Sequence, residues 1–529
     1  MPAAGMSKTR AHFAALAALA VFIPSASLAQ TSGTAAAITA GEARASRAFD
    51  AAKKLGTPDL YAFLKPMPKG AELHYHLGGG VYAETSIAEA VKQGICINPT
   101  TARYAPPASG TACGPGTIPA GEAVRDQKLY DRLVDAFSMR SFVPSAGFSG
   151  HDQFFSGNRT NGPTGNMGES LAEIVTRAAD ENEIYLEIMT SPGFRKSLLS
   201  VSKMPWPGDS ETTITREQLA KLRDAMLAAG ILDDIPAGRK EMDDAEAAQR
   251  TIEKCPGQPA CNIKTHYIYT IGRGQSPISV FAQALIGFEL NSADPRFVGI
   301  NIAAPEDGRV SMMDYHLHMQ ILDYLHSVYP KVNLTLHAGE LAPGLVPPEG
   351  LRFHIREAVE LGHAQRIGHG VDVLYEDDAA GLLKEMAAKH IMVEINLTSN
   401  DGILGVKGID HPLSGYIAAH VPVALSTDDE GNSRGDLTHE YVKGAFEQHL
   451  DYMELKKMAR TSFEHAFLYG ESIWAAPDDF TRRKPACAAA ITATSTPTAA
   501  CAVLLKSSER ATEQWELEHR YAVFEAGIQ

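Results

Sequence analysis

The sequence of 529 residues has no run rich in lysine and arginine, and no stripe of basic residues interleaved with aromatic ones. Its formal net charge is −15, so the basic clusters by which proteins attract nucleic acid are missing, and we expect no nucleic-acid partner. Solenoid-type repeats and a clean interdomain linker are missing too. The length permits one large barrel with insertions or two to three domains, and a hydrophobic content of 44% is ordinary for a globular protein.

No stretch of the chain is long and apolar enough for a comfortable membrane span. The nearest to one, residues 13–23, follows Lys8 and Arg10 and precedes Ser27-Leu28-Ala29, and this order is typical of a signal peptide. We predict cleavage near Ala29 and export to the periplasm or the medium, without stable membrane insertion. An uncleaved anchor is the alternative.

Cysteine is scarce: there are six, none with the spacing of metal ligands. An even number in an exported chain favours disulfides, although six cysteines allow fifteen connectivities. Their spacing favours three sequence-local pairs, which would staple surface insertions. These pairs are Cys96 with Cys113, Cys255 with Cys261, and Cys487 with Cys501.

Apolar runs of strand length alternate with helical segments along most of the chain. The expected strands are 72–77, 184–189, 266–270, 297–302, 332–337, 366–369, 391–396 and 423–426. Such alternation is typical of parallel βα units, and eight units favour an α/β fold of the TIM (β/α)8 barrel type over an open doubly wound sheet.

The remaining segments divide the chain around this barrel. We predict a signal peptide at 1–29, an N-terminal helical extension at 30–66, the barrel at 67–475, and a C-terminal helical extension at 476–529. The N-terminal extension is expected to pack outside the barrel or to mediate association into a homodimer. An insertion at about 94–165, rich in Pro, Gly, Ser and Thr, follows the first strand and contains one helical patch near 127–138. After the last strand, 441–469 is expected to be helical.

Two histidines mark the end of the first predicted strand. His74 and His76 are two residues apart, so on a strand both side chains lie on one face, and Gly78-Gly79-Gly80 ends the strand abruptly. Two such imidazoles make half of a zinc or iron site. A pair of buried histidines bonded to backbone carbonyls explains this motif equally well when it is taken alone.

Three downstream motifs favour the metal site. His337-Ala338-Gly339-Glu340, Gly368-His369-Gly370 and Asp428-Asp429 each follow an apolar strand. In a TIM barrel the C-terminal ends of all strands meet at the face that carries the active site. We therefore expect His74, His76, His337 and Asp428 to bind one catalytic metal ion and to lower the pKa of its water.

The remaining polar residues have predicted roles in a hydrolysis. His369 is placed to orient or deprotonate the water, and Glu340 to protonate the substrate if burial raises its pKa. Asp428 is expected to be catalytic as well as a ligand. Asp429 could accept a hydrogen bond from substrate if the backbone bends at the strand end.

These motifs together resemble the adenosine deaminase family of metal-dependent hydrolases over residues 67–467, and any one of them alone would be weak evidence. The signal peptide, the N-terminal extension and the insertion resemble the secreted, growth-factor-related branch of that family. The motifs are Met67-Pro68-Lys69-Gly70, His74-Tyr75-His76, His337-Ala338-Gly339-Glu340, Arg366-Ile367-Gly368-His369-Gly370 and Ser426-Thr427-Asp428-Asp429.

The resemblance implies one Zn2+ per chain and a purine nucleoside as substrate. It implies that Glu340 protonates the purine at N1, that His369 positions the attacking hydroxide, and that Asp429 binds N7. The backbone of Gly299 would meet N3. Attack at C6 would release ammonia and yield inosine.

One departure leaves the substrate open. Gly78 stands where the resemblance implies an acidic or amide residue that contacts the ribose, so sugar recognition must come from elsewhere, such as Glu187 or the insertion at 94–165. The alternatives are another 6-aminopurine, including 2′-deoxyadenosine, adenine and N6-substituted adenosine, or a non-catalytic growth-factor-like binding protein. Iron, manganese and cobalt are alternatives to zinc.

Overall fold

The computed structural model describes residues 39–105, 113–156, 163, 167–208 and 214–529. The predicted signal peptide lies outside these ranges. No helix in the described ranges is both long enough and apolar enough to cross a membrane.

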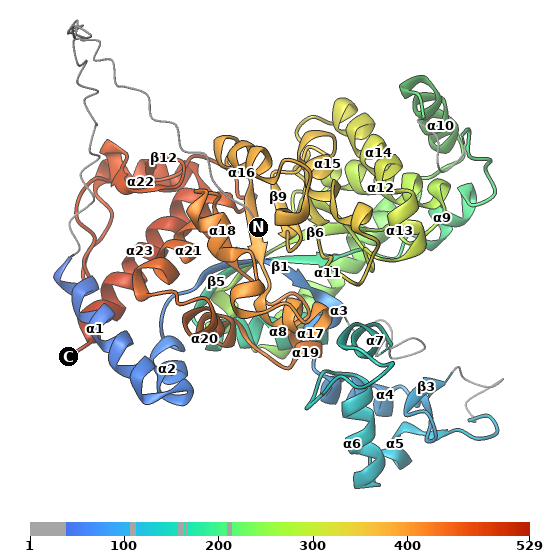
Figure 1. The fold of residues 1–529 in the computed structure, drawn as a ribbon, viewed down its shortest axis with the longest axis horizontal. Coiled ribbons are helices and arrows are strands. Elements are labelled where there is room, and N and C mark those ends of the chain that lie inside the picture. The colour runs from blue at the N-terminus through green and yellow to red at the C-terminus, as the bar shows by residue number, and fades with distance from the viewer. Residues whose placement is uncertain (1–38, 106–112, 157–162, 164–166, 209–213) are drawn as a thin grey trace, which may run out of the picture. The chain divides into compact units, whose positions relative to one another are not determined.

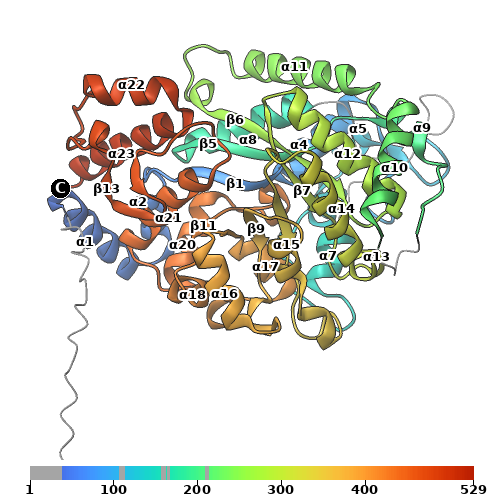
Figure 2. The same ribbon diagram turned by 90° about the horizontal axis from the view of Figure 1, so that it is seen from above.

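Eight parallel strands close into a barrel at the centre of the molecule (Figures 1 and 2). Their order is β1-β5-β6-β7 in one sheet and β8-β9-β10-β11 in the other. Parallel bridges from Ile300 to Leu334 and from Tyr75 to Asp428 join the two sheets at both seams. The strands are β1 (Gly70–His76), β5 (Glu183–Thr190), β6 (Lys264–Gly272), β7 (Phe297–Ala303), β8 (Thr335–Ala338), β9 (Arg366–His369), β10 (Met392–Ile395) and β11 (Val423–Leu425).

The TIM barrel predicted from the alternation is therefore confirmed. Both faces of these strands are covered, which is why they are continuous apolar runs in the sequence instead of alternating ones. Strand β5, for example, is buried from Glu183 through Met189.

Helices surround the barrel in chain order. They are α8 (Met167–Asp180), α10 (Arg216–Ala228), α11 (Ile235–Ile252), α12 (Pro277–Ala293), α14 (Tyr315–Val328), α15 (His354–Glu360), α16 (Ala379–Ala388), α17 (Leu397–Leu404), α18 (Leu413–Ala418), α20 (Leu437–Glu447) and α21 (Tyr452–His465). Helix α12 is apolar almost all round because it packs against both β6 and β7 as well as α14.

The prediction of one continuous helix over 441–469 is wrong. The structure breaks it into α20 and α21 at His449, which has φ 58°. Asp451 then starts α21 with a capping box, accepting from Glu454 N–H while the Glu454 side chain accepts from Asp451 N–H. The cap was readable in the sequence as Asp-x-x-Glu.

The chain's two helical extensions meet on α21. Helices α1 (Ala40–Leu55) and α2 (Thr57–Leu64) and the last helix, α23 (Glu509–Gly527), lie beside it in both views (Figures 1 and 2). The buried Lys456 of α21 pairs with Glu42 of α1 at 3.0 Å and with Glu525 of α23. Lys456 thus bonds to both extensions from the barrel side, and Arg460 of α21 adds an ion pair with Glu518 of α23 at 2.7 Å.

The insertion after β1 has a small core of its own. Helix α4 (Ala83–Lys92) leads into an antiparallel sheet of order β3-β2-β4, made of Arg103–Ala105, Cys96–Asn98 and Ile118–Pro119. Helices α5 (Ala120–Ala123), α6 (Gln127–Ala136) and α7 (Gly150–Ser156) follow. The predicted helical patch is confirmed as α6. The sheet was not predicted, because strands of two or three residues are too short to show a period of two.

All three predicted disulfides are confirmed. Cys96–Cys113 ties the insertion, Cys255–Cys261 lies just before β6, and Cys487–Cys501 ties the segment before α23. They therefore staple segments outside the barrel strands, as their spacing predicted.

Candidate active site

Four side chains from three parts of the chain converge at the C-terminal end of the barrel. His74 and His76 come from β1, His337 from β8 and Asp428 from just after β11, and their ligand atoms all lie within 4.8 Å of one another. His76 Nε2 is 3.1 Å from His337 Nε2, and Asp428 Oδ1 is 3.5 and 3.3 Å from Nε2 of His74 and His76. Only strand closure brings these positions together.

The donor set fits a metal ion. His74 Nδ1 lies 2.7 Å from Glu394 Oε2 and His337 Nδ1 lies 2.9 Å from Asn301 Oδ1, so each ring donates there and turns the lone pair of Nε2 into the cluster. In the described part of the chain, the buried His74 Nε2 has no hydrogen-bond partner. Converging imidazole lone pairs and a carboxylate are the ligands of a divalent cation such as zinc.

Beneath the cluster lies a buried network of charges. Arg366 Nε donates to Glu394 Oε1 and Nη2 donates to Glu187 Oε2, each at 2.7 Å, and all three side chains are buried. Glu394 thus links the guanidinium to His74. Glu187 also accepts from Phe467 N–H, so its contacts are those of a buried structural acid, a role that its strand position left as open as a sugar contact.

His369 and Glu340 lie beside the cluster. Oε1 of Glu340 is 3.9 Å from His369 Nδ1, and His369 Nε2 is 3.8 Å from Asp428 Oδ2. Burial, then the nearby carboxylates of Asp428 and Glu306, raise the pKa of Glu340 well above its usual value. Burial lowers the pKa of His369 to about 3, so its ring is neutral. The pair therefore offers a protonated acid and a neutral base in one place.

The chain bends sharply at Asp428 and Asp429. Asp428 has φ 64°, and its Oδ2 accepts a hydrogen bond of 2.7 Å from Ser399. Asp429 lies against Gly79, where a Cβ would be 1.3 Å from its Oδ1, so only glycine fits at position 79. This bend lets two successive acids turn towards the mouth of the barrel.

The structure does not bring Gly299 to this cluster. Gly299 lies two residues before Asn301, the β7 residue that contacts His337, and so about 6.6 Å further from the C-terminal face. A Cβ on Gly299 would meet Phe467 and Ile268. Just after β7, Ala304 has φ 135°, and its carbonyl oxygen accepts from Arg273 Nε at 3.0 Å.

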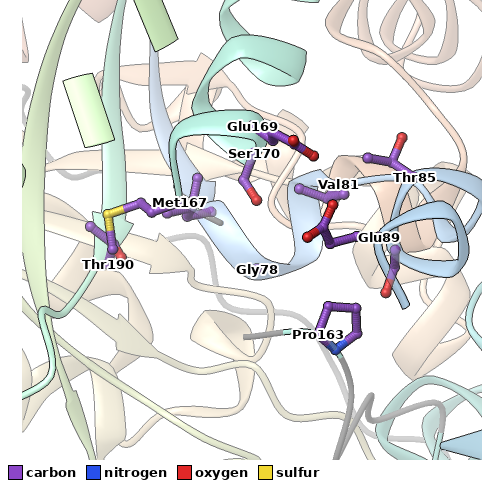
Figure 3. Close-up of a pocket in the computed structure, with 11 residues that line it drawn as sticks. Gly78, Val81, Thr85, Glu89, Pro163, Met167, Glu169, Ser170 and Thr190 are labelled. Atoms are coloured by element: carbon purple, nitrogen blue, oxygen red, sulfur yellow. The ribbon is translucent and has the colours of Figure 1, made fainter. Parts of the chain in front are cut away.

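A cavity of about 360 Å³ opens just after β1, where Leu77 and Gly78 line it (Figure 3). Val81, Pro163, helices α4 and α8 and the end of β5 supply the rest of the described lining, which holds hydroxyl groups and the carboxylates of Glu89 and Glu169. No lysine or arginine is among the described lining residues. A Cβ at Gly78 would meet nothing within 4 Å, so a side chain at this position has room in the cavity.

Sequence reasoning missed several polar residues that hold the site in place. Asn301, Glu394, Arg273 and Glu306 each lie in or just after a barrel strand and contact a predicted site residue or its backbone. A signal was present, since Asn301 and Glu394 are polar residues within apolar strands, and Arg273 and Glu306 follow a strand by one and three residues.

The comparisons with known proteins agree with this geometry. The family model for adenosine deaminase matches residues 257–473, which carry His337, Glu340, His369 and Asp428. Through this stretch the chain is similar to the adenosine deaminase family. The other two candidate metal ligands, His74 and His76, lie outside the matched stretch. The barrel brings them to His337 and Asp428.

Individual relatives match over a shorter region. The chain is 34% identical to an adenosine deaminase of Clostridium perfringens (strain 13 / Type A) over 135 residues, which are 25% of this chain and 37% of the relative. It is 35% identical to an adenosine deaminase of Enterococcus faecalis over 138 residues, 26% of this chain and 37% of the relative. The chain thus spans just over a third of the length of these curated relatives.

Solved structures align over more of the chain at lower identity. An Arabidopsis N6-mAMP deaminase is 20% identical with a TM-score of 0.49, covering 77% of this chain and 95% of that one. An adenine deaminase from Arthrobacter aurescens is 17% identical with a TM-score of 0.44, covering 76% and 94%.

Proposed function

We propose that this protein is an exported, zinc-dependent enzyme that deaminates adenosine, and 2′-deoxyadenosine, to the corresponding inosine and ammonia. The observation that carries the proposal is the convergence of His74, His76, His337 and Asp428 with a protonated Glu340. The family match over 257–473 supports the same reaction class. The adenosine deaminases of C. perfringens and E. faecalis favour adenosine as the first substrate to test.

The metal would be held by His74, His76, His337 and Asp428. A zinc ion bound there supplies Lewis acidity and a water whose pKa is lowered towards neutrality. The chain's own contribution is to orient the donors through Glu394 and Asn301 and to exclude bulk water by burial. Iron, manganese or cobalt in the same ligands would be distinguished by elemental analysis.

Proton transfer falls to the residues beside the ligands. Glu340, protonated because of burial and neighbouring carboxylates, donates to N1 of the purine and so makes C6 more electrophilic. His369, with a neutral ring, orients the attacking water. Asp429 would contact the ring at N7, and its place over Gly79 is compatible with that role.

The test is a comparison of wild type with Glu340→Gln, following ammonia release and the ultraviolet change from adenosine to inosine. Loss of the general acid should reduce kcat by about 10²–10⁴-fold while zinc content stays the same. Glu360→Gln, on the surface end of α15, is the control and should behave as wild type. Zinc-loaded wild type that releases no ammonia from any 6-aminopurine would contradict the enzyme proposal and favour the binding-protein alternative.

The cavity at Gly78 favours a second candidate, a 6-aminopurine other than unsubstituted adenosine. Its volume of about 360 Å³ leaves room next to Gly78, and the two carboxylates in its lining, Glu89 and Glu169, are both paired with Lys92. Comparing kcat/KM for adenosine, 2′-deoxyadenosine, adenine, N6-methyladenosine and AMP would rank them. Gly78→Asn introduces at this position the amide that the family resemblance implies. If the sugar binds in this cavity, this variant should raise kcat/KM for adenosine relative to adenine.

Export is supported by the three disulfides, which persist in oxidising compartments. The mass of the mature protein recovered from periplasm or medium would locate the cleavage site predicted near Ala29. The homodimer and the growth-factor-related branch stay predictions, and sedimentation of the mature protein tests the former.

A further inference from the structure

The loop that carries Glu340 is held by a carboxylate from another strand end. Glu306, just after β7, accepts from Gly339 N–H at 3.1 Å and from Glu340 N–H at 2.7 Å. Gly339 has φ 74°, and a Cβ there would lie 2.4 Å from Asp372. The turn therefore requires glycine, and it directs two successive buried N–H groups to one acceptor.

The carboxylate of Glu306 is itself held by the ring of His354 and the guanidinium of Arg273. His354, at the start of α15, places Nδ1 2.6 Å from Oε1 of Glu306, and Arg273 places Nη2 3.6 Å from Oε2. All three side chains are buried. Burial alone would raise the pKa of Glu306, but Arg273 and His354 hold it at about 2, so the carboxylate is charged. A charged acceptor makes shorter and stronger hydrogen bonds than a neutral one.

Arg273 also ties neighbouring strand ends together. It follows β6, donates from Nη1 to His337 O at 3.0 Å in β8, and donates from Nε to Ala304 O at 3.0 Å after β7. The backbone at His337 and the backbone at Glu340 are thus fixed by the same pair, Arg273 and Glu306. The carboxyl of Glu340 then lies 3.9 Å from His369.

We propose that Glu306, clamped by Arg273 and His354, is a positioning residue that sets the direction in which Glu340 presents its proton to the substrate. This inference rests on the proposed deaminase function. Glu306 is not among the four ligating side chains, and its carboxylate is fully engaged by the loop and its two clamps.

The first test compares Glu306→Gln with Glu376→Gln in the zinc-loaded full chain. Glu376 is the matched control, since it is also buried and accepts from two successive backbone groups, Ile355 N–H and Arg356 N–H, at the start of α15 instead of from the backbone of residues 339–340. A small displacement of a catalytic group costs about 10²-fold in rate, so kcat of Glu306→Gln should fall by about that factor. KM and zinc content should change little, and Glu376→Gln should keep the wild-type kcat.

The second test needs no turnover. Hydrogen exchange of a peptide covering residues 337–342 should become faster in Glu306→Gln and stay slow in Glu376→Gln. If wild type deaminates no 6-aminopurine, the proposed function fails while this measurement still tests the clamp. Unchanged exchange would overturn the inference, and so would faster exchange with an unchanged kcat, because the role would then be structural alone.

A milder variant guards against misfolding. His354→Asn keeps a hydrogen-bond donor but withdraws it from Glu306, and it should show the same two effects at smaller amplitude. If Glu306→Gln does not fold, kcat and hydrogen exchange of residues 337–342 are measured in His354→Asn instead. A lower kcat with faster exchange supports the positioning role, and no change in either overturns it.

Discussion

At the scale of single residues, the orientation of a metal-binding histidine depends on the residue that accepts a hydrogen bond from its other ring nitrogen. The ring of His74 is oriented by Glu394, and Glu394 is in turn held by Arg366 and by Thr335 Oγ1 at 2.7 Å. These residues lie on four different strands of the barrel. The ligand geometry therefore depends on strand register and not on the His-x-His motif alone.

We predict that Glu394→Gln lowers zinc affinity by about 10–100-fold, because an amide orients His74 less strongly than a carboxylate does. Competition with a chromogenic chelator measures this. Glu187→Gln is the matched control, since Glu187 is paired with the same Arg366 but does not touch His74. Equal loss of affinity in both variants would show that the ion-pair network as a whole, and not Glu394, controls the metal.

At the scale of elements, the segments outside the barrel strands depend on cross-links. The insertion has three strands of two or three residues and a core that includes Ile97 and Leu133, and Cys96–Cys113 closes a loop of 17 residues through it. The segment before α23 is closed by Cys487–Cys501 over 14 residues. Small cores of this kind rely on disulfides for stability.

Replacing Cys96 and Cys113 together by serine should destabilise the insertion by about 3 kcal/mol, the cost expected for a loop of this length. Hydrogen exchange should then rise over residues 96–105 and 118–136 and stay unchanged in β5 to β11. The corresponding Cys487 and Cys501 double variant should raise exchange near the C-terminus instead. A uniform rise across the barrel in the first variant would contradict the prediction.

Elements also show where sequence reasoning succeeded. The eight barrel strands were predicted because each is a short segment rich in apolar residues that lies between predicted helices or ends at a polar or glycine-rich turn. The break between α20 and α21 was missed because apolar residues continue across it, and only the Asp451 cap reveals it. The sheet of the insertion was missed because its strands are too short for any period.

At the scale of the whole molecule, the barrel buries acids of two kinds. Glu306 and Glu394 are charged, because their partners outweigh burial and hold each pKa at about 2. Glu440 belongs to the other kind, since burial raises its pKa to about 7 although Thr398 N–H donates to it. Below that pH the folded protein holds a proton that the unfolded chain would release.

The sign of this linkage predicts a loss of stability towards alkaline pH. An acid whose folded pKa is raised stabilises the fold below its unfolded pKa of about 4.3, and that stabilisation is lost as pH rises through the folded pKa, here about 7. Thermal unfolding of zinc-loaded protein from about pH 5 to about pH 8 should therefore show a falling Tm, and Glu440 should contribute little further change above about pH 8. Glu440→Gln, which cannot ionise, should flatten that fall, and an equally steep fall would contradict the role of Glu440.

What the sequence determined by itself is local. The period of the apolar runs predicted the strands, the spacing of the cysteines predicted their pairs, and His74, His76, His337, Glu340, His369 and Asp428 could be named because each ends a strand in a parallel barrel. Each of these signals lies within a short stretch of the chain, at most 17 residues for a cysteine pair.

Only the tertiary structure decided which groups hold these residues and which do not reach them. Gly299 was expected at the substrate, yet β7 places it about two residues too deep, a difference set by strand register. Glu187 was a candidate sugar contact, yet it pairs with Arg366, which lies 179 residues away in the chain. Hydrogen bonds and ion pairs across such separations depend on how the barrel closes, and closure has no local signature in the sequence.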